Sequence, residues 1–464
     1  MKKIFLSVLF LSCMSLGALT AQNTQDEDSE FIRKIYDEAL THSNSYEWLK
    51  YLSVEIGARL SGSAEAAAAV EFTRQMMDSL GLDDVRLQEV MVPHWVRGDK
   101  EIVRIVHSGM GDVDLHALAL GNTVGTGPDG LVAEVVEVHG LDELEALGRA
   151  GIEGKIVFYN RPMDPKHIHT FRAYGGAVDQ RTRGAAAAAQ YGAVATLVRS
   201  MTTSLDDVPH TGVQIYKDGV PQIPATAIST NDAELLSRLL KKEKVKVYIR
   251  SNCRMLEEKL SYNVIGEIRG SEFPDEIILV GGHLDSWDVG QGAHDDGAGC
   301  VQSMDVLAML RQLGYKPKRT LRAVMFMNEE NGGRGGDKYW AVSNEKGEFH
   351  LGAIESDSGG FSPRGFTCDA EESVFDNHFE RAMSWGELFK PYGVTIEKGG
   401  SGADVGGGKS QKGALFGLRP DSQRYFDLHH TNDDLFEKVN KRELELGAAA
   451  MTSLVYLLDQ HGLD

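Results

Sequence analysis

Residues 281–299 read GGHLDSWDVGQGAHDDGAG and directly follow the apolar run 277–280. Six of these nineteen residues are histidine or aspartate, which is more than a solvated loop needs: His283, Asp285, Asp288, His294, Asp295 and Asp296. Imidazole nitrogens and carboxylate oxygens bind divalent zinc, and the same groups transfer protons in catalysis. The stretch therefore predicts a chemical site, but by itself it does not say which side chains take part.

Three later segments combine acids or histidines in a similar way. They are Asn328-Glu329-Glu330 after the apolar run 320–327, Ser356-Asp357-Ser358 after the run 350–355, and Leu428-His429-His430 before the last helical stretch. Taken alone, Asp357 is typical of a helix N-cap. Several such loops favour a shared site, because two histidines, two aspartates and a glutamate suffice for two zinc ions when one carboxylate bridges both. Glu329 is then free to act as a general base.

The segments between these loops alternate between strand and helix patterns. Strands are expected at 262–268, 276–281, 320–327 and 350–355, and helices at 299–313, 336–343, 372–385 and 443–458. This alternation predicts an α/β fold with a mixed, largely parallel sheet flanked by helices. Active sites of such sheets lie beyond the carboxyl ends of the strands, where these loops belong. The N-terminal part adds helices at 31–53 and 64–80 and a strand at 85–92.

Residues 116–250 have a different character. Short β-like runs are separated by glycines, and an Ala-rich helix is expected among them: 131–138, 155–159 and 245–249 for the runs and 183–191 for the helix. The histidines there, His167, His169 and His210, are scattered and are interpreted as solvated loop residues. We expect a β-rich domain inserted into the catalytic one. The chain then divides into a signal peptide (1–21), a first catalytic part (22–115), the insertion (116–250) and a second catalytic part with the metal site (251–464).

Composition narrows the class of partner. The 464-residue chain has a formal net charge of -20 at pH 7, which argues against nucleic acid and anionic membranes, because these partners need a basic face. Its 42% hydrophobic and 25% charged residues are typical of a soluble globular protein. Cys253, Cys300 and Cys368 are too few for a disulfide framework, so we interpret them as buried thiols, with a single bridge as the alternative.

The N-terminus carries an export pattern. A positive segment, Met1-Lys2-Lys3, precedes the apolar run 4–11, and small residues lead up to Ala21. This order is typical of a signal peptide cleaved near Ala21, and its apolar centre is short for a membrane span. A lipoprotein site at Cys13 fits less well, because the apolar character continues past it. The mature protein is expected to be secreted or periplasmic, with no membrane partner beyond the signal peptide.

Taken together, the motifs GGHLDSWDVGQGAHDDGAG, MNEENGG, ESDSGG and YFDLHHT resemble those of the co-catalytic di-zinc exopeptidases. The nearest branch is similar to the carboxypeptidase Q, or plasma glutamate carboxypeptidase, subfamily. The motifs follow one another in order within residues 260–440. The segment ELEALGRAGIEGKIVFYNRP, the Ala-rich helix and PQIPATAIST look like a protease-associated domain, in agreement with the expected insertion.

The resemblance implies two Zn2+ ions and assigns their ligands. His283, Asp295 and Asp357 are similar to the ligands of the first ion in the family. Asp295, Glu330 and His430 are similar to the ligands of the second ion, so the resemblance implies that Asp295 bridges the two ions. A bridging carboxylate of this kind is what a pair of ions acting on one substrate bond needs.

The resemblance also gives roles to two further acids. Glu329 falls on the general base of the family. Asp285 falls on the acid that supports the ligand His283, and a carboxylate that accepts the imidazole N–H would fix the tautomer and the orientation of the ring. An aspartate lies four residues after each of His429 and His430, as in the family.

Thr431 directly after His430 favours His430 over His429 as the ligand. Asp434-Leu435 stands where related sequences usually have Asp-Thr, a departure that concerns the contact supporting the ligand. Asp288, His294 and Asp296 are interpreted as scaffolding, with Asp296 capping the next helix or, as the alternative, hydrogen-bonding a ligand residue. Substrate contacts are expected from three other residues, Asp404 for an ammonium group and Arg424 or Tyr425 for a carboxylate or an oxyanion.

These features predict a secreted di-zinc exopeptidase that hydrolyses short peptides or dipeptides through a metal-activated water. Aminopeptidase or dipeptidase action is favoured. The alternatives are carboxypeptidase action, or a related zinc amidohydrolase or glutaminyl cyclase. A non-catalytic binding ectodomain is the weakest alternative, because all five ligand positions and Glu329 are filled. A homodimer stays an open prediction.

Overall fold

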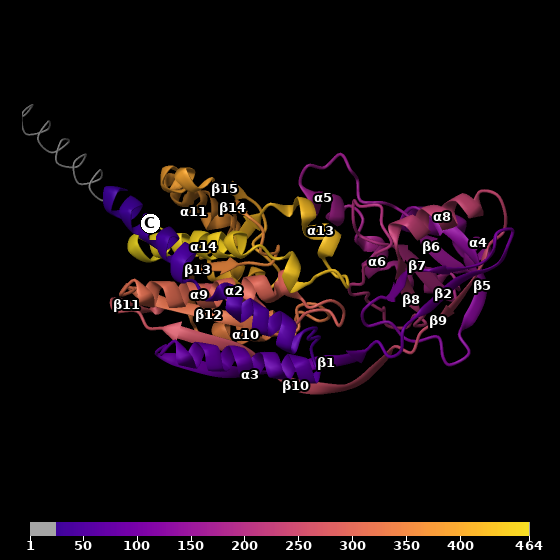
Figure 1. The fold of residues 1–464 in the computed structure, drawn as a ribbon, viewed down its shortest axis with the longest axis horizontal. Helices are drawn as coiled ribbons and strands as arrows, with labels where there is room; N and C mark the ends of the chain where they lie inside the picture. The colour runs from indigo at the N-terminus through magenta and orange to yellow at the C-terminus, as the bar shows by residue number, and fades with distance from the viewer. Residues whose placement is uncertain (1–24, 464) are drawn as a thin grey trace, which may run out of the picture.

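The computed structural model describes residues 25–463, which form two eight-stranded sheets side by side in one elongated molecule (Figure 1). The predicted signal peptide lies outside the described residues. The first sheet is built from both ends of the chain, and the second is built from the segment between β1 and β10. Cys253, Cys300 and Cys368 are free and buried, which confirms their interpretation as buried thiols. Within residues 25–463, none of the helices combines the length and apolar character needed to cross a membrane.

The first sheet has the order β1-β10-β12-β11-β13-β16-β14-β15. Its strands are β1 (Asp84–Val96), β10 (Arg254–Ile268), β12 (Arg319–Phe326), β11 (Phe273–His283), β13 (Phe349–Glu355), β16 (Ala414–Pro420), β14 (Pro363–Asp369) and β15 (Thr395–Lys398). The four central strands β12, β11, β13 and β16 run parallel, and β10 and β14 join them antiparallel. This confirms the mixed, largely parallel sheet and its four predicted strands. The run Ile277–Val280 is apolar throughout because β11 is buried on both faces.

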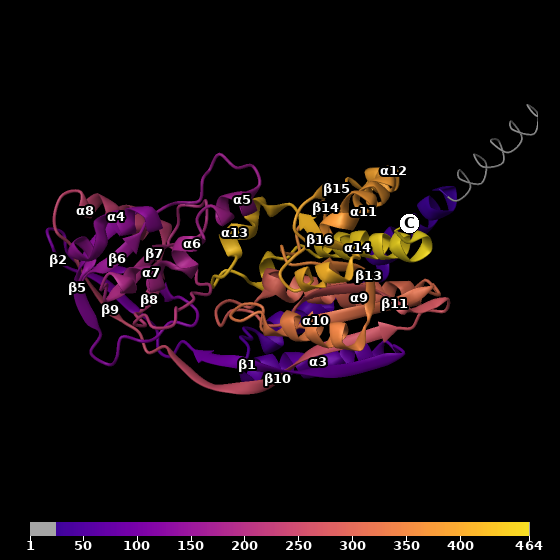
Figure 2. The same ribbon diagram turned by 180° about the vertical axis from the view of Figure 1, so that it is seen from behind.

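Helices cover both faces of this sheet. One face packs against α2 (Ser45–Lys50), α3 (Ala64–Ser79), α9 (Ala298–Gln312) and α14 (Lys441–His461), and the other packs against α10 (Arg334–Lys346). The helices α11 (Glu372–Ser384) and α12 (Gly386–Phe389) lie near β14 and β15 (Figure 2). Ser63 and Asn440 begin α3 and α14 as N-caps, because their side chains accept a backbone N–H three residues on.

The prediction of one continuous helix over 31–53 is wrong, because the helix is interrupted. The chain forms a helix over 25–42, then α2, and then a π-helical turn at Tyr51–Ile56. Ser43 lies at the break, where its hydroxyl accepts the Ser45 N–H and donates to Asp305 of α9. This side-chain contact competes with continuation of the helix, which the apolar spacing alone does not reveal.

The second sheet has the order β3-β2-β9-β5-β6-β7-β8-β4. Its strands are β2 (Ile102–Ser108), β3 (Gly111–Leu115), β4 (Ala117–Ala119), β5 (Leu131–Val138), β6 (Ile156–Tyr159), β7 (Ala195–Arg199), β8 (Ala225–Ile228) and β9 (Lys246–Arg250). The first strand of this sheet therefore begins at residue 102, whereas the change in composition predicts that the insertion begins at residue 116. One face packs against α4 (Leu141–Ile152) and α7 (Gly184–Gln190), and the other against α8 (Thr230–Leu240).

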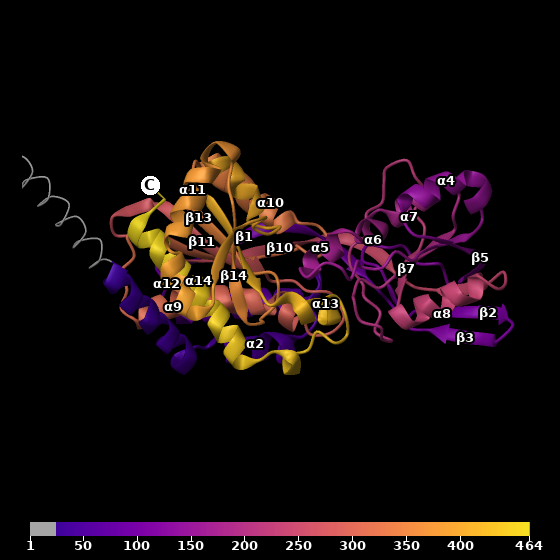
Figure 3. The same ribbon diagram turned by 90° about the horizontal axis from the view of Figure 1, so that it is seen from above.

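The two sheets meet at α13 (Tyr425–Leu428), which belongs to the first part, and at α5 (Thr170–Gly175) and α6 (Asp179–Thr182), which belong to the second (Figures 1 and 3). The ring of Phe171 in α5 stacks on Tyr425 in α13 with centroids 5.3 Å apart. On the same junction, Gly121 lies against the Trp287 ring so closely that a Cβ at Gly121 would overlap the indole. Close packing fixes the insertion against the catalytic loops.

Candidate metal centre

The carboxyl ends of three neighbouring strands supply most of the cluster. His283 is the last residue of β11, Glu329 and Glu330 follow β12, and Asp357 follows β13. Since β12, β11 and β13 are adjacent and parallel, their following loops lie at one edge of the sheet. This is where the sequence pattern places catalytic loops, and the physical reason is the common direction of the strands.

Asp295 lies at the centre of the cluster. It lies in the kinked segment Ala293–Gly297 that precedes α9, where the backbone of Asp295 and Asp296 is not helical. Its Oδ1 lies 3.2 Å from Nε2 of His283, and its Oδ2 lies 3.2 Å from Nε2 of His430. The two oxygens of one carboxylate thus face two different histidines, as a carboxylate that bridges two metal ions must do.

Two groups of side chains form around these oxygens. On one side, Nε2 of His283 lies 3.5 Å from Oδ1 of Asp357. On the other side, Nε2 of His430 lies 3.2 Å from Oε2 of Glu330. Atoms that bind one zinc ion at about 2.0–2.2 Å with tetrahedral angles lie about 3.3–3.6 Å apart. The four donor pairs lie 3.2 to 3.5 Å apart, within or just below this range, so both groups have close to the dimensions of a zinc site.

The hydrogen bonding of the cluster also fits two cations. Oδ2 of Asp295 is buried and makes no hydrogen bond, although buried carboxylate oxygens are normally satisfied. His283, Asp295, Glu330 and His430 are at most 9% exposed in their side chains. So many buried acids at one place are costly without opposite charge. The donor set of imidazole and carboxylate is the one that zinc takes in proteins.

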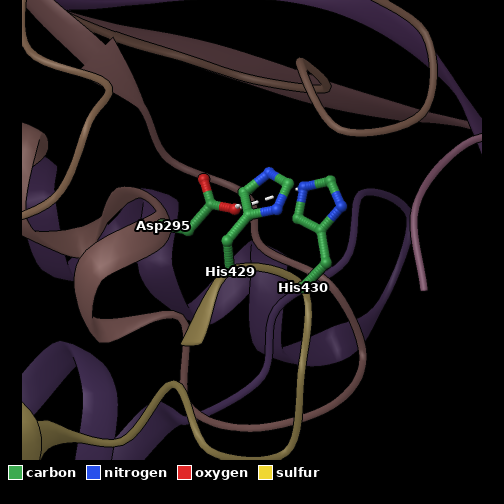
Figure 4. A group of neighbouring side chains, drawn as sticks. All are labelled: Asp295, His429 and His430. Atoms are coloured by element: carbon green, nitrogen blue, oxygen red, sulfur yellow. Dashed lines mark ion pairs between the residues drawn. The ribbon is translucent and has the colours of Figure 1, made fainter. Parts of the chain in front are cut away.

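The two adjacent histidines differ in what they reach. Their rings stack with centroids 3.5 Å apart, and both face the Asp295 carboxylate (Figure 4). Nε2 of His430 is close to both Asp295 and Glu330, whereas Nε2 of His429 lies 3.8 Å from Asp295. Burial and then the neighbouring His430 hold the pKa of His429 well below its usual range, so His429 is a neutral ring beside the centre. The geometry favours His430 as the ligand.

The contact predicted for Asp285 is wrong in one respect. Nδ1 of His283 lies 2.9 Å from the backbone carbonyl of Asp285, so the carbonyl accepts the imidazole N–H and the side chain does not. The Asp285 carboxylate instead accepts the backbone N–H groups of Asn328 and Glu329, at 2.6 and 3.1 Å. Asp285 therefore supports His283 through its backbone and positions the Glu329 loop through its carboxylate.

Glu329 is half-buried beside the ligand groups. Burial raises the pKa of its carboxyl to about 8, and the carboxylates of Asp357 and Glu330 add to the rise, while His283 opposes it. A carboxyl with a pKa near neutral pH can both accept and return a proton. Its position next to Glu330 allows it to face the same space as the ligands without being one.

Two further aspartates hold the backbone of the site. The Asp434 carboxylate accepts the backbone N–H groups of His294 and Asp295, at 2.8 and 3.1 Å. Although Leu435 follows Asp434 where related sequences usually have threonine, Asp434 therefore still supports the site. Its contact is with the backbone of the proposed bridging residue Asp295. Asp296 accepts the N–H of Gly299 at 3.0 Å, which confirms its prediction as a helix cap, and also the N–H of His283 at 3.1 Å.

Of the three predicted substrate contacts, two lie near the cluster. Asp404 is buried, and its Oδ2 makes no hydrogen bond. Burial raises its pKa well above the usual value, and Glu355 and Glu329 add to the rise. Tyr425 is buried, and burial and the nearby Asp295 raise its pKa, so it stays a donor. Arg424 is not in the cluster: its side chain is 60% exposed and pairs with Glu443.

The insertion contributes residues that the sequence pattern does not identify. His210 is buried, and its Nδ1 donates to the backbone carbonyl of His429 at 2.9 Å, so its prediction as a solvated loop residue is wrong. His167 and His169 are exposed, as predicted. Nη1 of Arg181 lies 3.4 Å from Nδ1 of His430. No local pattern points to Arg181 or His210, because both reach the site through the docking of the insertion.

We expect the stability of the chelated protein to fall as pH rises from about 7 to 9. In the folded chain, burial raises the pKa of Glu329 to about 8 and that of Glu330 to about 7, and carboxylates outweigh burial to raise that of His430 to about 9. A group whose pKa is higher in the folded chain than in the unfolded chain stabilises the folded state at low pH. This contribution to the free energy of unfolding is lost as the pH rises through the pKa of the folded chain. Thermal unfolding in EDTA should show a Tm lower by ~2–5 °C at pH 9 than at pH 7.

A zinc-loaded sample of the same protein is the control for this prediction. Bound cations favour the ionised carboxylates and the neutral imidazole, so the difference in Tm between loaded and chelated protein should widen over the same pH range. A chelated protein whose Tm rises from pH 7 to pH 9 would contradict the prediction.

Residues 263–455 match the model of peptidase family M28. The chain is 36% identical to carboxypeptidase Q of Bos taurus over 423 residues, which cover 90% of this chain and 85% of that protein. It is 35% identical to carboxypeptidase Q of Rattus norvegicus over 476 residues, which cover 98% and 97% of the two chains.

Solved structures give the same picture of the fold. A peptidase M28 precursor from Shewanella amazonensis superposes with a TM-score of 0.88 at 33% identity, covering 94% of this chain and 97% of the other. A zinc aminopeptidase from Bacillus subtilis superposes with a TM-score of 0.64 at 20% identity, covering 89% and 94%. At that lower identity, the likeness is one of fold.

Proposed function

Because this chain belongs to peptidase family M28 and is a zinc metallopeptidase, we propose that its five clustered side chains hold two zinc ions. His283, Asp295 and Asp357 would bind one ion, and Asp295, Glu330 and His430 the other. The observation that carries the proposal is the Asp295 carboxylate, whose two oxygens face His283 and His430 at 3.2 Å each. The proposed activity is exopeptidase hydrolysis of dipeptides and other short peptides.

Two zinc ions held by these residues would supply Lewis acidity, which would polarise the peptide carbonyl and lower the pKa of the attacking water. Glu329 accepts the proton of that water and returns it to the leaving amine. Glu329 directly precedes the proposed ligand Glu330 after the end of β12 and is not itself a proposed ligand, so its carboxylate is available to take this proton. Asp285 holds the Glu329 backbone in place, which keeps the carboxylate directed at the substrate.

The proposal is tested with purified, zinc-loaded protein and four forms of one dipeptide. These are the free dipeptide, its N-acetylated form, its C-terminal amide and the form blocked at both ends. An exopeptidase should hydrolyse the free dipeptide and leave the doubly blocked one intact, and the two singly blocked forms report which terminus is needed. Protein that binds two zinc ions per chain and hydrolyses none of the four would overturn the proposal.

Export is part of the same proposal. The positive N-terminal segment and the apolar run 4–11 support a cleaved signal peptide and a secreted or periplasmic protein. The protease-associated character of the insertion and the homodimer remain predictions. Substrate contacts by Asp404 and Tyr425 stay predictions as well, supported by their position near Glu329 and Asp295.

A further inference from the structure

Arg59 is a fully buried arginine beside the loop that joins two of the proposed zinc ligands. Its exposed fraction is 0%, and it comes from the short segment 57–62 that precedes α3. The loop, residues 284–292, runs from His283 to the kinked segment that carries Asp295. Arg59 and the start of this loop are 225 positions apart in the chain, so their contact exists only in the folded protein.

The loop has no regular structure of its own. Residues 284–292 form neither helix nor strand, and Gly290 and Gly292 have positive φ angles of 70° and 54°. An irregular segment loses much conformational entropy when it is fixed, so its shape depends on contacts from outside. Nevertheless, its two ends carry groups that need one spacing, because Nε2 of His283 and Oδ1 of Asp295 lie 3.2 Å apart around one proposed zinc position.

The guanidinium of Arg59 bonds to both ends of the loop. Its Nε donates to the carbonyl of Leu284, the residue directly after His283, at 2.6 Å. At the other end, Nη1 donates to the Gln291 carbonyl at 3.0 Å and Nη2 donates to the Gly292 carbonyl at 2.9 Å. A guanidinium is planar and presents its N–H groups in fixed directions. It therefore fixes the two ends of the loop relative to each other.

Backbone contacts and close packing add to these bonds. The backbone N–H of Arg59 donates to Oγ of Ser286 at 3.1 Å, and the backbone N–H of Ser286 donates to the Arg59 carbonyl at 3.4 Å. A Cβ at Gly292 would overlap the Ser286 side chain and lie 2.8 Å from Nη1 of Arg59. The arginine and the loop thus fit each other without space for a second arrangement.

The partners of this guanidinium are carbonyls and not carboxylates. Among residues 25–463, no carboxylate oxygen lies within 4.0 Å of its nitrogens. Burial lowers the pKa of Arg59, while Cys300 and Asp434 oppose that shift. Arginine stays protonated in proteins, so all of its N–H groups remain donors. Since a buried cation is costly, the bonds to the loop carbonyls are what this side chain has in return.

We propose that Arg59 is a positioning residue for the zinc centre, which fixes both ends of loop 284–292 and so sets the spacing at which His283 and Asp295 bind one zinc ion together. This rests on the proposed function, because it takes these two residues to be ligands. Groups that orient metal ligands contribute about 10- to 100-fold to metal affinity without touching the metal. Lysine at this position would keep the charge but offer one nitrogen in place of three.

The test measures the zinc affinity of Arg59→Lys by competition with a chelator. Its affinity should be about 10- to 100-fold weaker than that of the wild type. The rise in Tm between chelated and zinc-loaded protein should shrink as well, because stabilisation by a bound ligand decreases with its affinity. A role in general stability alone would lower both Tm values and leave their difference unchanged.

Arg322→Lys is the matched control, because it makes the same substitution at another buried arginine. Arg322 is 4% exposed in β12, where it pairs with Glu267 and Glu348. The control should lower the Tm of chelated and zinc-loaded protein alike and keep the zinc affinity of the wild type. An equal loss of zinc affinity in Arg322→Lys and Arg59→Lys would overturn the proposal, since the loss would then follow from any buried arginine.

Ser286→Ala is measured in parallel in case Arg59→Lys does not fold. It keeps the guanidinium and removes one contact with the loop, so it should weaken zinc binding by about 2- to 10-fold, as expected for one hydrogen bond. Zinc affinity equal to that of the wild type in folded Arg59→Lys, or in Ser286→Ala if only that variant folds, overturns the proposal. Wild-type protein that does not bind two zinc ions per chain counts against the proposed function itself.

Discussion

Glu329→Gln should lower kcat by about 10²- to 10⁴-fold while the protein keeps two zinc ions per chain. The amide has nearly the same size as the carboxylate but cannot accept the proton of the attacking water. It leaves the five proposed ligands in place, because Glu330 and not Glu329 approaches His430. Steady-state hydrolysis of a free dipeptide and zinc quantification on the same sample measure both parts of the prediction.

Glu345→Gln is the matched control for this change. It is the same substitution at an exposed position on α10, away from the site. It should behave like the wild type in both measurements. Near-normal turnover by Glu329→Gln with two zinc ions bound would show that another group takes the proton. A loss of zinc in that variant would mean that Glu329 is a ligand, contrary to the proposed assignment.

Asp295→Ala should remove both zinc ions and reduce activity by at least ~10⁴-fold. Its two carboxylate oxygens face both ligand groups, so each ion loses a ligand at once and the surrounding acids lose their common partner. Zinc content should fall from about two per chain to below about 0.5 after dialysis. Circular dichroism on the same sample checks that the fold is retained.

Asp357→Ala provides a graded comparison, because Asp357 approaches His283 alone among the ligand histidines. About one zinc per chain should remain in it. Asp275→Ala, an exposed aspartate in the same strand as His283, should retain both ions. If Asp295→Ala and Asp357→Ala lose the same amount of zinc, the bridging role of Asp295 is wrong.

The insertion contacts the loop that carries the two adjacent histidines of the proposed metal centre. Tyr174 of α5 approaches the ring of His429 edge-on, with centroids 5.4 Å apart, and Arg181 of α6 reaches His430. Both helices lie at the junction of the two sheets, next to α13 (Figures 1 and 2). Loops that carry function are commonly positioned by a rigid scaffold. Here both sheets, with their helices, position the loop that carries His429 and His430.

Much of the catalytic part follows from local sequence. The strands at 262–268, 276–281, 320–327 and 350–355 are confirmed within β10 to β13, because buried parallel strands require continuous apolar runs. The helix at 443–458 is confirmed within α14, because its apolar residues recur at the three- and four-residue intervals of a helix. The strands that the sequence patterns miss are β14 to β16 and most of those in the second sheet, where runs of three to seven residues carry little periodicity. The helices α4 and α8 are missed as well.

By itself, the sequence determined which loops carry the chemistry and which residue types they offer. Zinc accepts few kinds of ligand, and parallel strands place their following loops at one edge, so the loops that carry the chemistry are recognisable before any coordinates exist. The resemblance to the di-zinc exopeptidases then singles out His283, Asp295, Glu330 and Asp357 within them. The tertiary structure alone decided how the Asp295 oxygens are shared, that the Asp285 carbonyl and not its carboxylate meets His283, and that Arg181 stands behind His430. These are contacts between side chains and backbone whose direction depends on packing, and in the case of Arg181 on how two separately formed sheets dock, which spacing along the chain does not encode.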